Sequence, residues 1–532
     1  MVLIQLLAAT LVLLIILLHF GNAYSLSRDE FPSDFVFGAS TSAYQVEGAA
    51  NKDGRKPSIW DTFSHSGNGN MYKGNGDIAC DQYHKYKEDV QLMANMGLDA
   101  YRFSISWSRL IPDGKGPINP KGLEYYNNLT NELISHGIQP HVTLHHWDLP
   151  QKLEDEYEGW VNRSIVKDFT AYAEVCFREF GDRVKYWTTV NEGNVYASFG
   201  YDLGMLPPQR CSPSFQANCS RGNSSTEPYL VAHHMLLAHA SAARLYRKKY
   251  KVKFTRVVIH LTLLQGTQHG FIGFNLLTFG FVPLTNTSED IIATQRVQDF
   301  MIGWFLNPFT FGDYPDIMKK NAGSRIPSFT KKESNLVKGS IDFLGINFYF
   351  SFYVKNSPAI QQIKDRDYME DIEVETIQLT TNDTSPFEVP ITPWMLQGVL
   401  DSVKKDYGNF PIYIHENGQQ TLSNSSLDDW SRVKYLHEYI GAMANALRSG
   451  SNVKGYFVWC FLDGFELLGG YEMSYGLYYI NVKDPSLKRQ PKLSAKWYTN
   501  FLKRKPMDPK VTIEIGKNQL FPSHASLLDN AK

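Results

Sequence analysis

Residues 100–144, AYRFSISWSRLIPDGKGPINPKGLEYYNNLTNELISHGIQPHVTL, contain the unit that decides the fold. A short run rich in aromatic and β-branched residues, Ala100 to Ile105, is followed by a polar loop. Apolar residues then recur at the spacing of one helical face, at Leu123, Tyr126, Leu129 and Leu133. The helix should end at Gly137, and Gln139 to Leu144 form the next apolar run. This order predicts parallel strands joined by crossover helices.

The same unit recurs between residues 30 and 500. We expect strands at Val36 to Ala39, Ala100 to Ile105, Gln139 to Leu144, Tyr186 to Val190, Gly270 to Leu277, Phe343 to Asn347, Ile412 to His415 and Gly455 to Cys460. Eight parallel strands with helices between them predict a single (β/α)8 TIM barrel with long βα loops. The alternative is an open doubly wound sheet, which normally carries a Gly-rich phosphate turn that is missing after the first strand. Without a Gly/Ser linker, residues 24–506 are expected to form one domain, followed by a tail over 507–532.

Composition and charge exclude several classes of protein. The 53 Lys and Arg residues are balanced by 54 Asp and Glu residues, so no basic excess favours nucleic acid as a partner. Hydrophobic residues make up 43% of the chain and aromatic residues 14%, which allows a large core and excludes disorder for the bulk of it. The aromatic share also suits a cleft that stacks flat rings.

The N-terminus has the pattern of a targeting segment. An apolar run from Leu3 to Phe20 ends in small residues, which predicts a signal peptide over residues 1–23 with cleavage after Ala23. The alternative is a membrane anchor, because the run is just long enough to span a bilayer. We favour secretion, with no membrane association after cleavage. Seven N-x-S/T sequons fit this route, at Asn128, Asn162, Asn218, Asn223, Asn286, Asn382 and Asn424.

The five cysteines predict one disulfide and no metal site. Cys211 and Cys219 lie close together in a loop-like stretch rich in Pro, Ser and Asn, and are expected to pair. Cys80, Cys176 and Cys460 are interpreted as buried free thiols, because none has a partner at zinc-ligand spacing. The histidine groups His145-His146 and His233-His234-His239 likewise lack the i,i+4 spacing that places two imidazoles on one helical face. We therefore predict no metal and no cofactor.

Two glutamates indicate the chemistry. Glu192 ends YWTTVNE and Glu416 ends PIYIHENG, so both follow strands whose carboxyl ends should open into one cavity. Other strand ends supply Gln45, Arg102, His146, Trp147, Tyr349, Trp459 and Glu466. Cleavage of a glycosidic bond needs one carboxyl to protonate the leaving oxygen while another stabilises or attacks the anomeric centre. A lone Glu after a strand is usually solvated, whereas this pairing favours a glycosidase.

A series of segments strengthens this interpretation. In order along the chain, from about Phe31 to Phe501, they are FVFGASTSAYQVEGA, YRFSISWSRL, HVTLHHWDLP, TTVNE, GDYP, DFLGINFY, IHENG and GYFVWCFLDGFE. As a set they resemble the signature segments of glycoside hydrolase family one, the plant β-glucosidases. The resemblance implies a (β/α)8 barrel that cleaves small-molecule β-glucosides with retention of configuration. In a plant, the secretory route would lead to the apoplast or the vacuole.

The resemblance also assigns roles to individual residues. Glu192 would be the general acid/base and Glu416 the nucleophile, with their carboxyls about 5 to 5.5 Å apart. Arg102 and Tyr349 would keep Glu416 ionised, which leaves the proton on Glu192. The positions that match glucose-binding residues are Gln45, His146, Asn191, Trp459 and Glu466, and Trp394 matches the aromatic residue beside the aglycone.

The chain departs from the family pattern near the site. Gly193 stands where Pro is common, His415 where Thr is frequent, and Leu467 where Trp often follows the sugar-binding Glu. The combination VNEGNVYASFGY with FELLGGY is similar to a plant branch that includes acyl-glucose-dependent glucosyltransferases acting on flavonoid or anthocyanin acceptors. Transglucosylation is therefore the main alternative to hydrolysis. A non-catalytic sugar-binding protein is the third class.

Residues 252–266, VKFTRVVIHLTLLQG, have no counterpart in the family pattern. They offer a second candidate for the fifth strand, beside HGFIGFNLL. Our hypothesis is an insertion from a misassigned intron, and the alternative is a tolerated surface insertion. If the segment is part of the native protein, it should protrude at the bottom of the barrel, away from the reacting groups.

Overall fold

The computed structural model describes residues 26–66, 74–213, 219–251, 253–254, 264–265, 268–358, 366–380, 387–467 and 469–505, with only the backbone of 253–254 and 264–265. The predicted signal peptide, the predicted tail after residue 506, and the sequons at Asn218 and Asn382 lie outside the described residues. The sequons at Asn128, Asn162, Asn223, Asn286 and Asn424 are all exposed.

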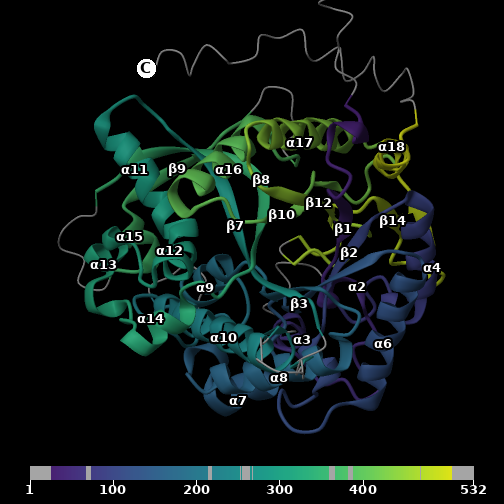
Figure 1. Cartoon of the computed structure of the whole chain (residues 1–532), viewed down its shortest axis with the longest axis horizontal. Coiled ribbons are helices and arrows are strands. Elements are labelled where there is room, and N and C mark those ends of the chain that lie inside the picture. The colour runs from purple at the N-terminus through teal and green to yellow at the C-terminus, as the bar shows by residue number, and fades with distance from the viewer. Residues whose placement is uncertain are drawn as a thin grey trace, which may run out of the picture.

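Eight parallel strands close into a barrel at the centre of the molecule (Figure 1). They are β1 (Val36–Ser40), β2 (Ala100–Ser104), β3 (Gln139–His145), β4 (Tyr186–Val190), β7 (Phe271–Pro283), β8 (Phe343–Asn356), β10 (Ile412–Asn417) and β12 (Val453–Trp459). Each strand pairs with the next one named, and β12 pairs with β1 to complete the ring. The predicted barrel and its eight strands are therefore confirmed, and the open sheet is excluded.

Helices surround the barrel (Figure 1). They are α2 (Ala43–Val46), α3 (Ile59–His65), α4 (Gln82–Met96), α5 (Trp107–Leu110), α6 (Pro120–Ser135), α7 (Gln151–Tyr157), α8 (Ile165–Phe180), α9 (Gly193–Tyr201), α10 (Glu227–Lys249), α11 (Ser288–Gln298), α12 (Trp304–Phe311), α13 (Asp316–Ala322), α14 (Lys331–Val337), α15 (Tyr368–Ile372), α16 (Pro393–Tyr407), α17 (Trp430–Arg448) and α18 (Leu493–Leu502). Single turns of 3-10 or π helix occur at η1 (Arg28–Glu30), η3 (Gly159–Val161), η4 (Asp299–Gly303) and η5 (Gly323–Arg325). The apolar stripe on α8, which includes Ile165, Phe169, Tyr172, Cys176 and Phe180, is buried. Burial of such a face, rather than helix propensity alone, stabilises these helices.

Two strands continue beyond the barrel. After Thr278 the register of β7 on β8 shifts, and pairing then resumes from Gly280 to Pro283. The strand β9 (Val374–Gln378) adds antiparallel to the last part of β8. The start of α16 packs against this part of the sheet, where the hydroxyls of Thr392 and of Ser351 on β8 lie 2.8 Å apart. The extension therefore raises a wall at the carboxyl end of the barrel, where the candidate residues lie. Short two-stranded pairs complete the strands, with β11 (Thr421–Leu422) on β13 (Met473–Ser474) and β14 (Tyr478–Ile480) on β15 (Arg489–Pro491).

The described residues on either side of the segment 252–267 lie next to each other. Gln268 donates its backbone N–H to the Tyr250 carbonyl at 3.0 Å and forms a bridge with Lys251. The strands β5 (Lys253–Phe254) and β6 (Leu264–Gln265) pair antiparallel with each other outside the barrel sheet. The fifth barrel strand is thus β7, and the residues that flank the segment, Lys251 and Gln268, lie next to each other near the start of this strand.

Cysteine pairing follows the prediction. Cys211 and Cys219 form a disulfide, and the three remaining cysteines are free and buried. Within the residues that the structure places, none of the helices combines the length and apolar character of a membrane span.

Candidate active site

Polar side chains gather at the carboxyl ends of the barrel strands. Arg102 lies on β2, His146 follows β3, and Asn191 and Glu192 follow β4. Asn275 lies on β7, Asn347 and Tyr349 lie on β8, Glu416 lies on β10, and Trp459 ends β12. Gln45 lies on α2 after β1, and Glu466 lies in the loop after β12. Because parallel strands of a barrel end at one rim, residues from 45 to 466 meet in one place.

Glu416 is held by two donors. The Arg102 guanidinium donates to Oε1 at 2.6 Å, and the Tyr349 hydroxyl donates to Oε2 at 2.9 Å. The Arg102 and Glu416 side chains are only 1% and 5% exposed, so water screens their ion pair little. Charge-assisted hydrogen bonds of this kind favour the ionised carboxyl. The predicted contacts of Arg102 and Tyr349 with Glu416 are present.

Asn347 links the two glutamates. It pairs with Glu416 in the ladder between β8 and β10, and its amide donates to Glu192 Oε1 at 2.6 Å. Its Oδ1 accepts from Asn275 at 2.8 Å, and Asn275 Oδ1 accepts the backbone N–H of Glu192 at 3.1 Å. The sequence analysis missed both asparagines. Their signal was present, because a polar amide inside an apolar strand is buried and must find partners.

The two carboxyls differ in their proton affinity. Burial, followed by the nearby charge of Glu416, raises the pKa of Glu192 to about 8. The pKa of Glu416 is also raised by burial, but the charge and hydrogen bond of Arg102 and the hydroxyl of Tyr349 oppose this rise. Two carboxyls that share a dry site rarely ionise together. At neutral pH the proton therefore resides on Glu192 and Glu416 carries the charge.

Asn191 fixes the state of His146. Its Oδ1 accepts from Arg102 at 2.5 Å, so its amide nitrogen faces His146 Nε2 at 3.1 Å and donates to it. Burial lowers the pKa of His146 well below its usual value, so the ring is neutral and its proton lies on Nδ1. Nδ1 is buried and has no partner among the described residues. His146 thus holds an unused donor in the site.

Gln45, Glu466 and Trp459 form the other side of the site. Gln45 donates its amide to Glu466 at 3.2 Å, and its carbonyl accepts from the Ser42 hydroxyl at 2.6 Å. Burial, then the charges of Asp463 and Glu416, raise the pKa of Glu466 to about 8. The Trp459 indole stacks on the His146 ring with centroids 5.9 Å apart. Amides, a carboxyl and an indole face suit a polyhydroxylated ring.

The backbone at Glu192 is unusual. Its φ of 42° lies in the left-handed region, where a residue with a Cβ is strained, and it turns the chain from β4 into α9. At the next position a Cβ would stand 2.7 Å from the Phe274 ring. Phe274 therefore occupies the space beside Gly193, which leaves little room for a side chain at this position.

The remaining predicted residues lie outside this network. Trp394 is in the first turn of α16 and is 48% exposed, at the rim formed by the β7 and β8 extensions. Leu467 is buried, and His415 lies below the site with Nδ1 3.5 Å from Asn275. The Trp147 indole donates to the Asn191 carbonyl at 2.9 Å, so it positions the backbone there. Among the described residues no three His, Cys, Asp or Glu side chains form a cluster that could hold a metal ion.

Comparison with known proteins identifies relatives along almost the whole chain. The family model described as Glycosyl hydrolase family 1 matches residues 27–507. Beta-glucosidase 11 of Arabidopsis thaliana is 59% identical over 487 residues, which are 90% of this chain and 93% of that protein. Hydroxyisourate hydrolase of Glycine max is 56% identical over 486 residues, 91% of this chain and 83% of that protein. A rice β-glucosidase mutant solved in a covalent complex with Glc has a TM-score of 0.84 and 44% identity, and the match covers 90% of this chain and 99% of that one.

Proposed function

Because the chain belongs to glycosyl hydrolase family 1, it is a glycosidase, and we propose that it hydrolyses β-glucosides of small molecules with retention of configuration. The covalent complex of the rice enzyme with Glc supports a mechanism in two displacement steps.

In the first step Glu192 gives its proton to the oxygen of the leaving group while Glu416 attacks the anomeric carbon. The C1–O bond to the leaving group breaks, and an ester between glucose and Glu416 forms. His146 Nδ1, the Gln45 and Glu466 pair, and the Trp459 face would bind the sugar hydroxyls and C–H groups. Trp394, at the exposed rim, would lie beside the leaving group.

In the second step the ester removes the negative charge from Glu416. The repulsion that helped raise the pKa of Glu192 then disappears, so this pKa falls and Glu192 can act as a base. It takes a proton from water, the water oxygen attacks C1, and β-glucose leaves with Glu416 restored as a carboxylate. One carboxyl thus serves as acid and then as base because its neighbour changes charge.

The linked carboxyls carry this proposal. The Asn347 amide donates a hydrogen bond to Glu192, and Asn347 pairs with Glu416 in the strand ladder. Of the two glutamates, only Glu416 forms an ion pair with an arginine. The test incubates the Glu192→Gln variant with an activated 2-fluoroglucoside and maps the labelled peptide by mass spectrometry. One glucosyl group on the peptide that contains Glu416 is expected, with no label in Glu416→Gln. The same change at exposed Glu375 should leave turnover intact, and a label elsewhere would refute the assignment.

Transfer to an acceptor is the second candidate function. It uses the same ester and the same carboxyls, and differs in whether a flavonoid hydroxyl or water attacks C1. The departures at Gly193 and Leu467 favour testing it. Purified protein is given an aryl β-glucoside, or an acyl-glucose with a flavonoid, and free glucose is measured against glucosylated acceptor. Hydroxyisourate is the third substrate to test, because the hydroxyisourate hydrolase of Glycine max is about as similar to this chain as the β-glucosidases are. If the folded wild-type protein turns over none of these substrates, a non-catalytic sugar-binding protein is favoured.

We also propose that the protein follows the secretory pathway to the apoplast or vacuole. The disulfide between Cys211 and Cys219 is typical of oxidising compartments, and the five described sequons are exposed to glycosylation. Peptide-N-glycosidase treatment of protein from the native source should lower its mass, and N-terminal sequencing should begin at Tyr24.

A further inference from the structure

A groove rich in cations lies between α10 and α14, on the outside of the barrel. Its volume is about 840 Å³. Six basic residues line it, namely Arg244, Arg247, Lys248, Lys331, Lys332 and Lys338, and no carboxylate or aromatic residue does so in the described part of the chain. The helix α14 ends at residue 337, shortly before β8 begins at Phe343, and the last turn of α10 lies beside the start of β7, where the Tyr246 hydroxyl accepts the backbone N–H of Gly270 at 2.8 Å. The groove is therefore directed away from the rim that carries Glu192 and Glu416.

Five of the six charges in this groove are not neutralised by the described residues. Within the described residues, the side chains of Arg244, Lys248, Lys331, Lys332 and Lys338 form no ion pair or hydrogen bond, and all five are exposed. The chain as a whole carries a net charge of −1, so this is a local excess. Like charges at a shared surface repel one another, which disfavours the folded state unless an anion binds there.

The acidic residues beside the groove already have partners. Glu333 caps the start of α14 and pairs with Arg163, outside the groove. Asp342 accepts from Arg247 at 2.7 Å and lies 3.7 Å from Lys251. Neither carboxylate is left to compensate the lysines on α14.

Local helix chemistry does not explain the lysines on α14. Basic residues in the last turn of α10 are favoured by the helix dipole. Lys331 and Lys332 stand in the first turn of α14, where the dipole disfavours a positive charge. Their position across from Arg244 and Lys248 thus has a local cost and no local benefit.

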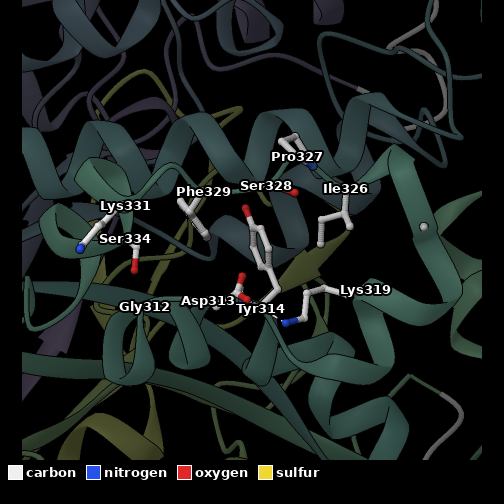
Figure 2. Close-up of a pocket in the computed structure, with 11 residues that line it drawn as sticks. Gly312, Asp313, Tyr314, Lys319, Ile326, Pro327, Ser328, Phe329, Lys331 and Ser334 are labelled. Carbon is white, nitrogen blue, oxygen red and sulfur yellow. Dashed lines mark hydrogen bonds and ion pairs between the residues drawn. The ribbon is translucent and has the colours of Figure 1, made fainter.

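A neighbouring pocket shows the contrast. This pocket of about 360 Å³ meets the groove at Lys331 and holds Tyr314 and Lys319 (Figure 2). Lys319 is neutralised there, with Nζ 2.7 Å from Asp313 and 3.0 Å from Asp316. Lys319 is thus paired with carboxylates, whereas Lys331, where the pocket and the groove meet, has no such partner among the described residues.

We propose that the groove binds a linear acidic polysaccharide through the carboxylates of its uronate units. From Ala240 to Lys248 the α10 side of the groove runs about 12 Å, enough for a few linked sugar rings. Flexible ammonium groups spread along two helices suit charges repeated along a chain better than one enclosed phosphate. The groove has no aromatic residue on which nucleic-acid bases could stack. In the proposed compartment such a polymer would retain the enzyme, whatever substrate the barrel hydrolyses.

The test measures binding of the full-length mature protein to polygalacturonate by isothermal titration calorimetry. The variant Lys248→Gln/Lys331→Gln/Lys332→Gln removes three groove charges. The control Lys87→Gln/Lys152→Gln/Lys496→Gln removes three exposed charges elsewhere. We expect the groove variant to lose about tenfold or more in affinity at about 50 mM salt, and the control about twofold or less. Fully methyl-esterified polymer should not bind.

Several results would overturn the proposal. They are no binding of the wild type at low salt, equal losses in the two triple variants, or capture by phosphatidylserine vesicles without binding of polygalacturonate. Hydrolysis of an aryl β-glucoside should be unchanged in both variants, which shows that they fold. Because binding is read without turnover, failure here is distinguishable from failure of the glycosidase assignment.

Discussion

The hydroxyl of Tyr349 offers a sharp test of how Glu416 is kept ionised. It donates to Oε2 of Glu416 at 2.9 Å, in a site where the carboxylate is almost fully buried. A hydrogen bond to a charged group contributes about 1.5 to 3 kcal/mol. Loss of a donor to the charged form raises a carboxyl pKa, by one unit for each 1.36 kcal/mol, hence by about 1 to 2 units in Tyr349→Phe.

The assay is the pH profile of kcat/KM for an aryl β-glucoside. As the proposed nucleophile, Glu416 would attack only as a carboxylate, so the acid limb of the profile should report its ionisation together with that of its coupled neighbour. In Tyr349→Phe this limb should move upward by about 1 to 2 pH units, and the ring contacts remain.

Tyr475→Phe is the matched control. The Tyr475 ring lies 6.0 Å from the Tyr349 ring, but its hydroxyl donates to Gln420 at 2.8 Å and not to Glu416. Its acid limb should stay close to that of the wild type. If the limb of Tyr349→Phe does not move, or both variants shift it equally, then Tyr349 does not hold Glu416 in its ionised form and the reasoning fails.

Three further predictions follow from other features. The basic limb of kcat/KM should fall near pH 8 as Glu192 loses its proton, and Glu192→Gln should remove that limb for activated glucosides; a limb that persists in the variant assigns it to another group. Gly193→Ala should lower the free energy of unfolding by about 1 to 3 kcal/mol, because the added Cβ would clash with the Phe274 ring. In the control Gly398→Ala, on α16, the Cβ meets open space, so the free energy of unfolding should rise by up to about 1 kcal/mol. Urea titrations that give the reverse order would contradict this. Replacement of residues 252–267 by two glycines should leave turnover and the unfolding midpoint unchanged, since the ends of the segment are already bridged, and loss of folding would show that the segment supports the barrel.

The sequence predicted the barrel because its signals are local. Stripes such as the one on α8 and the glycines after them define each helix, and the apolar runs between them define the strands. The ends of β7 and β8 were wrong, since both continue past the predicted Leu277 and Asn347. That continuation depends on pairing with each other and with β9, a tertiary contact that no local pattern reveals.

The site was predicted through its charged residues and missed through its neutral ones. Glu192, Glu416 and Arg102 stand out at strand ends, and the resemblance named the sugar-binding set. Asn275 and Asn347 were interpreted only as parts of strands, yet they orient Glu192 and connect it to Glu416. Their importance depends on which strands are neighbours across the closed ring, which becomes known only from the three-dimensional structure.

The distribution of the network over the barrel has a consequence for biosynthesis. Arg102, Asn191, Asn347 and Glu416 come from β2, β4, β8 and β10, so the reacting pair is assembled from strands that leave the ribosome far apart in time. A nascent chain that ends before residue 416 contains the proposed proton donor without the proposed nucleophile, so it should not cleave glucosides. In a refolding experiment, the recovery of turnover therefore reports that the strands of the barrel have paired around the whole sheet.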